Sequence, residues 1–403
     1  MSTLVLLVAA LSLAYIFSEA CKHINVPRVV GQIFAGIVIG IFAKDLLIPS
    51  TLDTFSLLSD VGIVLLFFFT GFEVNLKEFQ KHFKNTITIS AFNTAIPFVL
   101  GLLLTLWLGY GITVAILVGI CLAVSSTAIS LDFLEEFGLL KSKIGNLIIT
   151  TGAVDDLLEL IFTTIILAFL QISVGNGTIT SLFIGMLAFI GIATLARFLI
   201  IPFALNIVQK EHSASGLFMI ALILTMAMAS ISDYLGLGSL IGALIAGVLI
   251  RHSIMQEKTR RPWETHEISQ TIHTVSFGFL VPIFFVWVGI NTDITAVFSN
   301  PFLVIALSAI AIGGTVIGTA LAVLVNKGTW EEGILVGWGV TAKGDVELVI
   351  ATLALKNGLI AKDIYTALIL MAFITTLIAP IVFRRMIMDK MVRKNLKAGL
   401  KVS

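Results

Sequence analysis

The chain has 403 residues, of which 58% are hydrophobic and 12% are charged. An ordinary soluble domain has roughly 25% charged residues and keeps much of its surface polar, so this composition excludes such a domain and makes lipid the expected solvent. The formal net charge of +1 excludes a basic nucleic-acid-binding surface. The two cysteines, Cys21 and Cys121, are far apart in sequence, so a disulfide framework is not expected.

Thirteen apolar runs are candidates for membrane spans, which take roughly 17–25 residues each. The first has no charged region and cleavage site of a secretory signal, so it is predicted to be a span. The seventh carries Arg197, for which the sequence suggests either a split in the run or a buried partner. The runs cover approximately residues 2–21, 27–43, 56–74, 85–108, 111–137, 144–172, 178–208, 214–233, 236–251, 270–291, 300–326, 331–357 and 361–387.

Lys and Arg residues are concentrated in every second loop, and this pattern predicts the orientation of the chain in the membrane. The odd-numbered loops carry Lys22, Arg28, Lys77, Lys81, Lys84, Lys141, Lys143, Lys210, Arg251, Lys258, Arg260, Arg261 and Lys327, whereas the even-numbered loops carry Lys44, Lys356 and Lys362. Because positive residues stay on the cytoplasmic side, the N-terminus is expected outside and the C-terminus inside. Residues 1–390 are predicted to form a single transmembrane domain, and residues 391–403 a basic cytoplasmic tail.

Two runs at corresponding places are interrupted by polar residues and glycine. Runs 1–6 and 8–13 are predicted to be two six-span units joined by run 7, so that matching runs cross the membrane in opposite senses, as in transporters with inverted repeats. Ser125, Ser126 and Thr127 interrupt the fifth run, and Gly339, Thr341 and Gly344 interrupt its mate, the twelfth. Such paired breaks are the best sequence indication of a substrate site near the middle of the bilayer.

The sixth run contains three carboxylates, Asp155, Asp156 and Glu159. If its helix begins near residue 144, the aspartates lie about 17 Å along it, close to mid-bilayer. A charge at that depth costs at least ~2.5–3.5 kcal/mol, so it is expected to have a function or a partner. Two adjacent carboxylates cannot both ionise cheaply, so one is expected to be protonated, paired or bound to an ion. The alternative is a structural role as hydrogen-bond acceptors.

Lys343, in the twelfth run at a similar depth, is a candidate counter-charge, and Asp345 and Glu347 follow it. The sequence leaves open whether its salt bridge is functional or purely structural. Na⁺ is a hard cation that prefers oxygen ligands, which Asp156, freed backbone carbonyls and the hydroxyls of the fifth run would supply. Those hydroxyls have the alternative of bonding to their own helix. Glu73, at the end of the third run, is a further candidate, or it faces water.

Several short segments resemble, in this order and spacing, motifs of the monovalent cation/proton antiporter superfamily, specifically its bacterial and archaeal second branch. The segments are Val26–Ile33 with Gly36 and Gly40, Gly71–Asn75, Ser125–Ala128, Pro282–Phe285 with Gly289, and Lys343–Glu347. The resemblance covers nearly the whole membrane region. It implies an all-α polytopic fold with about 13 transmembrane helices, inverted repeats and two crossing broken helices, known as the sodium/proton antiporter fold.

The resemblance also implies roles for individual residues. Asp156 matches the carboxylate that binds cation and proton alternately, and Asp155 matches the one that pairs with a basic residue, here Lys343. The Asp-Asp pair resembles that of the electrogenic sodium/proton members. Glu159 matches no family role, and Lys343 stands where many relatives have Arg. A homodimer is implied, in which each protomer has a dimerisation part and a moving core part that are interleaved in sequence.

The function expected from these observations is secondary antiport of Na⁺ or Li⁺ against H⁺ by alternating access across the plasma membrane, with no cofactor. K⁺/H⁺ antiport is the alternative on the same scaffold. Alternatives of other classes are an ion-sensing receptor or channel and a Na⁺-coupled symporter of an organic anion. An enzyme is not expected, because no nucleophile–base pair or metal-ligand constellation is visible in the sequence.

Overall fold

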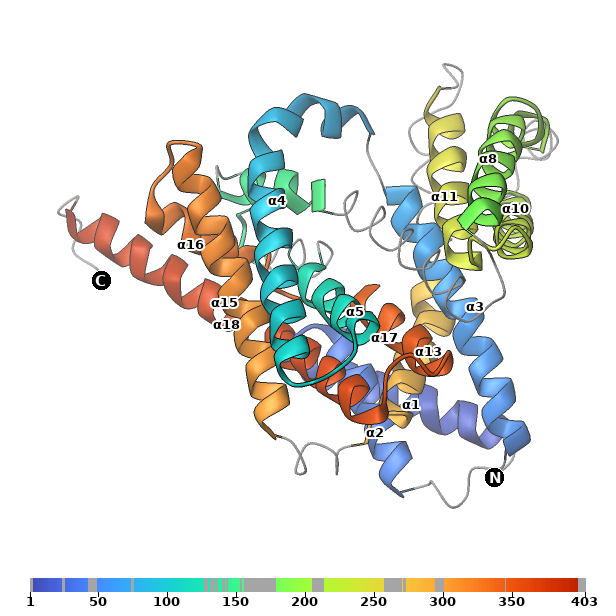
Figure 1. Cartoon of the computed structure of the whole chain (residues 1–403), viewed down its shortest axis with the longest axis horizontal. Helices are drawn as coiled ribbons and strands as arrows, with labels where there is room; N and C mark the ends of the chain where they lie inside the picture. The colour runs from blue at the N-terminus through green and yellow to red at the C-terminus, as the bar shows by residue number, and fades with distance from the viewer. Residues whose placement is uncertain are drawn as a thin grey trace. The chain divides into compact units, whose positions relative to one another are not determined.

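The structure, a computed structural model, is built from helices in the part of the chain that it describes (Figure 1). It describes residues 3–23, 26–42, 49–73, 76–126, 130, 134, 137–139, 142, 144–152, 154–155, 179–204, 214–256, 270, 273–293, 301–344 and 346–397. Across these ranges every regular element is helical. The predicted all-α architecture is therefore confirmed.

Seven of the described helices are long and apolar enough to cross a membrane. They cover Thr3–His23, Pro49–Phe72, Thr86–Trp107, Phe183–Ala204, His273–Ile290, Pro301–Val325 and Lys362–Met388, and shorter apolar helices cover Arg28–Phe42, Ile112–Ala123, Phe218–Tyr234 and Ser239–Ser253. The predicted runs coincide with these helices, so the polytopic membrane architecture is confirmed. The total of thirteen stays a prediction, because most of the sixth run lies outside the described residues.

The chain forms two compact units that are interleaved in sequence. The first unit comprises Met1–Ala14, Val38–Val74 and Ile161–Ile290. It holds the start of α1 (Thr3–His23), the end of α2 (Arg28–Phe42), and α3 (Pro49–Glu73), α8 (Ile179–Leu195), η2 (Ala196–Ile200), α10 (Ala214–Tyr234), α11 (Ser239–Gln256), η3 (Ser276–Leu280) and α13 (Val281–Ile290).

Within the first unit, α3 packs against α11 and α13, and α10 packs against α11. Glycines allow α3 and α11 to approach closely. A Cβ atom at Gly71 would lie 2.1 Å from the carbonyl oxygen of Leu244, and one at Gly247 would lie 2.1 Å from that of Phe68. Lipid provides no hydrophobic driving force for helix association, so helices in a membrane associate through close packing, which small residues allow. These glycines therefore explain why α3 and α11 lie so close together.

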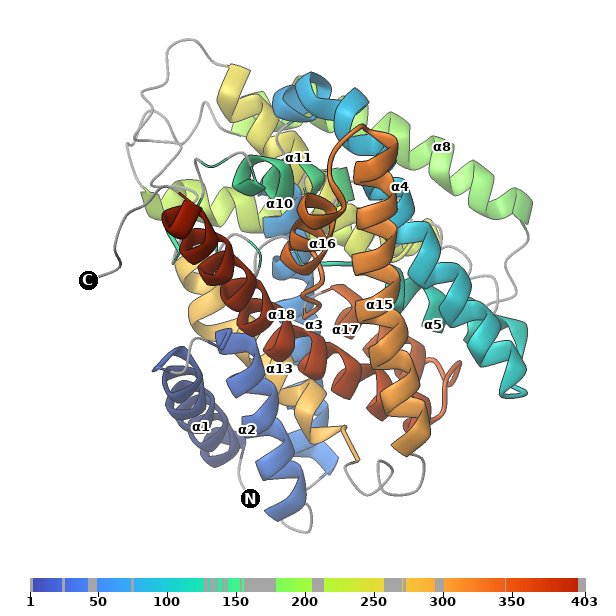
Figure 2. The ribbon, with the colours of Figure 1, turned by 90° about the vertical axis from the view of Figure 1, so that its left-hand side faces the viewer.

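The second unit comprises Tyr15–Ile37, Asn75–Leu160 and Asn291–Ser403. Its helices are α4 (Leu76–Trp107), α5 (Ile112–Ala123), the helical residues 144–152, α15 (Pro301–Val325), α16 (Trp330–Gly339), α17 (Val346–Lys356) and α18 (Lys362–Lys397). Helix α15 packs against α4, α16 and α18, and α4 also packs against α5 (Figure 2). This bundle contains the residues of the candidate site.

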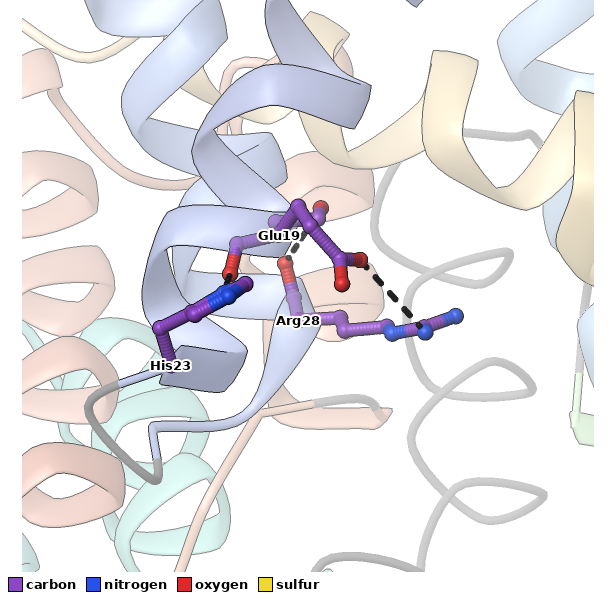
Figure 3. Close-up of polar contacts among 4 residues, drawn as sticks. Glu19, His23 and Arg28 are labelled. Carbon is purple, nitrogen blue, oxygen red and sulfur yellow. Dashed lines mark hydrogen bonds and ion pairs between the residues drawn. The ribbon is translucent and has the colours of Figure 1, made fainter.

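The second unit also contains the end of α1 and the start of α2, where basic residues meet a carboxylate. The guanidinium of Arg28 points toward the carboxylate of Glu19, with 3.8 Å between Nη2 and Oε2, and the Nδ1 of His23 donates to the Glu19 carbonyl oxygen at 2.7 Å (Figure 3). Both side chains of the ion pair are substantially exposed, so this pair contributes at most about 1 kcal/mol. The basic residues predicted for the first loop therefore lie at the polar end of α1 and the polar start of α2.

Candidate functional site

Helix α5 stops in the middle of the fifth predicted run. It ends at Ala123 because Val124 is extended, with φ −67° and ψ 142°, and Ser125 and Ser126 have no helical hydrogen-bond pattern. Ser130 is helical again, and its amide donates to the carbonyl oxygen of Ser126 at 3.4 Å. The predicted interruption is confirmed at Ser125 and Ser126, whereas Thr127 lies outside the described residues.

The twelfth predicted run is broken in the same way. A capping box of Thr329 and Glu332 starts α16, which ends at Gly339. Residues 341–344 are not helical, and the chain becomes helical again at Val346, where α17 begins. The predicted break is therefore confirmed. Two half-helices on either side of a break bring backbone amides and carbonyls to membrane depth, which membrane proteins tolerate where the break lines a site or is covered by protein.

The two breaks bind each other through a backbone hydrogen bond and through the side chain of Lys343. The amide of Ser126 donates to the carbonyl oxygen of Ala342 at 2.8 Å. The Nζ of Lys343 donates to the carbonyl oxygen of Val124, and the hydroxyl of Thr376 on α18 donates to the carbonyl oxygen of Lys343. Lys343 has no exposed surface. An ammonium group inside protein at this depth needs acceptors, and a carbonyl freed by the first break provides one.

Asp155 lies in the same place, with 4% of its surface exposed. Three neutral donors contact its carboxylate: the hydroxyl of Ser90 at Oδ1, and the amide nitrogen of Asn93 at 2.8 Å and the hydroxyl of Ser125 at 3.4 Å, both at Oδ2. Hydrogen bonds to an ionised acceptor are stronger than neutral ones, so this arrangement holds the carboxylate in a fixed orientation.

Ser90 and Asn93 were not among the predicted site residues. They lie on α4, 65 and 62 residues before Asp155 in sequence. The fourth apolar run does carry a signal, since Thr86, Ser90, Asn93 and Thr94 recur every three or four residues and are all buried. Such spacing places them on one helix face. A polar stripe in a lipid-solvated helix is expected to face other protein.

Among the supporting candidates, Glu347 is buried in the first turn of α17, and its backbone carbonyl accepts from the thiol of Cys121 at 3.7 Å. A helix N-terminus favours a nearby negative charge. Glu73 is the last residue of α3 in the other unit, and its side chain is not described. The remaining predicted site residues, Asp156, Glu159 and Asp345, lie outside the described residues.

Arg197 belongs to the other unit and has a partner there. Its Nη2 donates to the Nε2 of His252 on α11 at 2.7 Å, and its guanidinium carbon lies 5.3 Å from the centre of the Phe198 ring. The chain is π-helical at Ala196–Ile200. A π-helical turn interrupts the regular hydrogen bonds of an α-helix, often where a side chain needs a special position.

In the described part of the chain, no group of three His, Cys, Asp or Glu residues is arranged to hold a metal ion.

A comparison with sequence models of protein families identifies the family to which this chain belongs. The sequence model described as "Sodium/hydrogen exchanger, transmembrane" matches residues 7–388. The chain belongs to this family. The membership in the monovalent cation/proton antiporter superfamily predicted from the sequence motifs is thereby confirmed.

Individual relatives are similar over nearly their whole length. The chain is 26% identical over 369 residues to a Na⁺/H⁺ antiporter of Enterococcus hirae, which covers 91% of this chain and 93% of that protein. It is 26% identical over 388 residues to a probable Na⁺/H⁺ antiporter of Methanocaldococcus jannaschii, covering 95% and 96%. It is also 26% identical over 354 residues to the Na⁺/H⁺-K⁺ antiporter GerN of Bacillus cereus, covering 88% of each.

The fold is likewise that of a solved transporter. The structure of the sodium proton antiporter MjNhaP1 from Methanocaldococcus jannaschii matches with a TM-score of 0.70 and 15% identity, over 94% of this chain and 95% of that one. The sodium/proton antiporter fold predicted from the motifs is therefore confirmed. The two broken helices that contact each other in the second unit are part of it.

Proposed function

We propose that the chain is a secondary antiporter that exchanges Na⁺ or Li⁺ for H⁺. The observation that carries the proposal is a buried carboxylate, Asp155, held where two broken helices of a sodium/hydrogen exchanger meet beside the buried ammonium of Lys343. Full-length relatives named Na⁺/H⁺ antiporters favour the same pair of ions. Transport of ions, and no enzymatic reaction, is what this site supports.

The proposed chemistry is competition for one site. A carboxylate binds either a proton or a hard cation, so cation entry expels the proton and nothing must recognise both ions at once. Asp156 is assigned to this exchange, with the hydroxyls of Ser125, Ser126 and Thr127 as neutral ligands. Asp155 and Lys343 form the charged pair beside it. If Lys343 also releases a proton in each cycle, more than one proton moves per cation and transport is electrogenic.

The proposed motion is alternating access, in which the second unit carries the ion. Asp155, Lys343 and both breaks belong to that unit, so the whole candidate site would move together. The first unit is assigned to dimerisation, and the functional protein is proposed to be a homodimer. The location is proposed to be the plasma membrane, with the N-terminus outside and the C-terminus in the cytoplasm. This orientation puts the loops that are rich in Lys and Arg on the cytoplasmic side.

The second candidate function is K⁺/H⁺ antiport. It is favoured by the similarity to GerN, whose name includes K⁺ as well as Na⁺. The oxygen ligands of the site suit both cations, so the ligand types alone do not separate them. Competition between Na⁺ and K⁺ in a transport assay would separate the two functions.

The test is cation-induced proton movement in sealed vesicles that contain purified protein and a pH dye, with Na⁺, Li⁺ and K⁺ added in turn. Wild-type protein is expected to respond to Na⁺ and Li⁺, and the variant Asp156→Asn is expected to lose the response. An Asp156→Asn variant that keeps cation-driven proton movement would contradict the scheme. A folded wild-type protein that responds to no cation over a broad pH range would favour a receptor or an organic-anion symporter.

A further inference from the structure

Two buried oxygen atoms, one on a residue that binds Asp155 and one four residues before Asp155 in its helix, have no hydrogen-bond partner among the described residues. They are the Oδ1 of Asn93, a side chain with 1% of its surface exposed, and the Oγ1 of Thr151, which has none exposed. Burying a polar oxygen without a partner is costly, and native proteins leave very few such atoms. Of the buried atoms without a partner, these two are on a residue that binds Asp155 and on the residue one helical turn before it, so a ligand beside that carboxylate would satisfy them.

The orientation of Asn93 is fixed by Asp155. A carboxylate accepts hydrogen bonds, so it takes the amide nitrogen of Asn93, here at 2.8 Å from Oδ2. The amide oxygen must then point to the other side of the same planar group. Asn93 thus binds the carboxylate with one end and presents a neutral oxygen right next to it.

Thr151 differs from three helical threonines of the same unit, although Thr315 and Thr319 of α15 share its lack of a partner among the described residues. The hydroxyls of Thr105, Thr150 and Thr352 each donate to the carbonyl oxygen four residues earlier in their own helix, at 2.7 to 2.8 Å. This bond is available to a helical threonine in a common rotamer. The Oγ1 of Thr151 makes no such bond, so its hydroxyl points elsewhere.

The helix face that carries Thr151 also carries Asp155, which binds α4. Residues four apart lie one above the other, so Leu147, Thr151 and Asp155 share a face. At one end of it, Leu147 packs against a cluster formed by Ile89 of α4 with Ala322 and Val323 of α15, and at the other end Asp155 binds Asn93 of α4. Thr151 lies between these two residues on that face, one helical turn before Asp155.

We propose that Asn93 and Thr151 bind the transported cation, through the amide oxygen of one and the hydroxyl oxygen of the other. Neutral oxygens beside a carboxylate form the ligand type that a hard monovalent cation takes when it loses its water shell. This inference rests on the proposed function, since it names further ligands for the same cation. Asn93 also positions Asp155, whereas Thr151 contacts the ion alone.

The decisive variant is Thr151→Val, which removes the hydroxyl and keeps the shape. Because that hydroxyl has no partner among the described residues, its loss is expected to leave the melting temperature without Na⁺ unchanged or raised. The Na⁺ concentrations for half-maximal thermal stabilisation and for half-maximal exchange are both expected to rise roughly threefold to tenfold. Thr151→Ser keeps an oxygen and is expected to stay close to wild type.

The matched control is Thr150→Val, one residue away on the same helix. Its hydroxyl bonds to the carbonyl of Asn146, so its loss is expected to leave the Na⁺ dependence unchanged. Asn93→Ala is expected to weaken Na⁺ binding more than Ser90→Ala, because Ser90 only anchors Asp155.

Three results would overturn the inference: a wild-type Na⁺ dependence in Thr151→Val, equal effects of Thr150→Val and Thr151→Val, or a lower melting temperature of Thr151→Val with unchanged Na⁺ affinity. The last result would mean that a buried water or the fold itself uses this hydroxyl. Failure of the proposed function is distinguishable, because the wild-type protein itself would then show neither Na⁺-dependent stabilisation nor proton movement.

Discussion

Asp155 and Lys343 are linked through two adjacent residues of one helix break. The carbonyl oxygen of Val124 accepts from the Lys343 ammonium, and the hydroxyl of Ser125 donates to the Asp155 carboxylate. Side chains of two different segments are thus bound by neighbouring residues of a third, one through its backbone carbonyl and one through its side-chain hydroxyl. A change in either charge is transmitted to the same two residues, which gives the break a direct physical connection to the protonation state of the site.

Replacing Lys343 by Arg is expected to separate exchange from charge movement. Arg supplies a permanent positive charge for the Val124 carbonyl, but it does not release its proton in proteins. If Lys343 contributes one proton per cycle, the variant keeps Na⁺-driven proton movement and loses its dependence on membrane voltage. The measurement is exchange in vesicles at clamped potentials set with K⁺ and valinomycin.

Lys343→Ala is the companion variant. It leaves the buried Val124 carbonyl without its donor, and such an unsatisfied buried group typically costs about 1–3 kcal/mol. A markedly lower melting temperature is expected. Wild-type stability together with wild-type, voltage-dependent exchange in Lys343→Ala would refute both the structural and the electrogenic role.

Thr376 on α18 is expected to hold the second break in place. Its hydroxyl donates to the Lys343 carbonyl, whereas that of the adjacent Thr375 bonds within its own helix, to Ala372 at 2.9 Å. Thr376→Val orphans a buried carbonyl, which costs about 1–3 kcal/mol, and should lower the rate of exchange at saturating Na⁺. Thr375→Val is the matched control, and Thr376→Ser should restore the rate. Equal rates in the two Val variants would argue against this role.

Part of this site was predictable from sequence, and the reason is local chemistry. Ser125, Ser126, Gly339 and Gly344 are helix-breaking or polar residues inside apolar runs, so the two interruptions were visible without any knowledge of contacts. The mid-bilayer depth of Asp155, calculated from the rise of a helix, stays a prediction. These features depend on residues close together in sequence.

The contacts themselves were not predictable. Asn93 and Asp155 are 62 residues apart, and nothing in either segment names the other as its partner. The acceptor of Lys343 is a backbone carbonyl, which every residue has, so its identity as Val124 depends on how the two breaks are placed in space. A polar stripe on α4 indicated that the helix faces protein, but not which carboxylate it binds.

The close contact of α15 with α4 provides a test of the second unit's packing. A Cβ atom at Gly318 would lie 2.6 Å from the carbonyl oxygen of Phe92, a backbone atom that cannot swing away. Gly318→Ala is therefore expected to destabilise the protein by about 1–3 kcal/mol and to disturb the helix that carries Asn93. Gly313, on the same helix, has no atom within 4 Å of its Cβ position, so Gly313→Ala should be neutral or slightly stabilising. Melting curves in detergent measure both, and equal curves would mean that the two helices are further apart.

Cys121 reports whether the site is closed to water. It lies near the end of α5, just before the break that begins at Val124, has 1% of its surface exposed, and donates to the Glu347 carbonyl. Cys21, near the end of α1, is partly exposed, and both thiols are free. A small water-soluble maleimide should therefore add once to the native protein and twice after denaturation, as measured by intact mass. With Cys21→Ser, native labelling should fall to near zero. Rapid labelling of Cys121 in that variant would mean that water reaches the Lys343–Asp155 region in the resting protein, and its dependence on Na⁺ would then show which state is open.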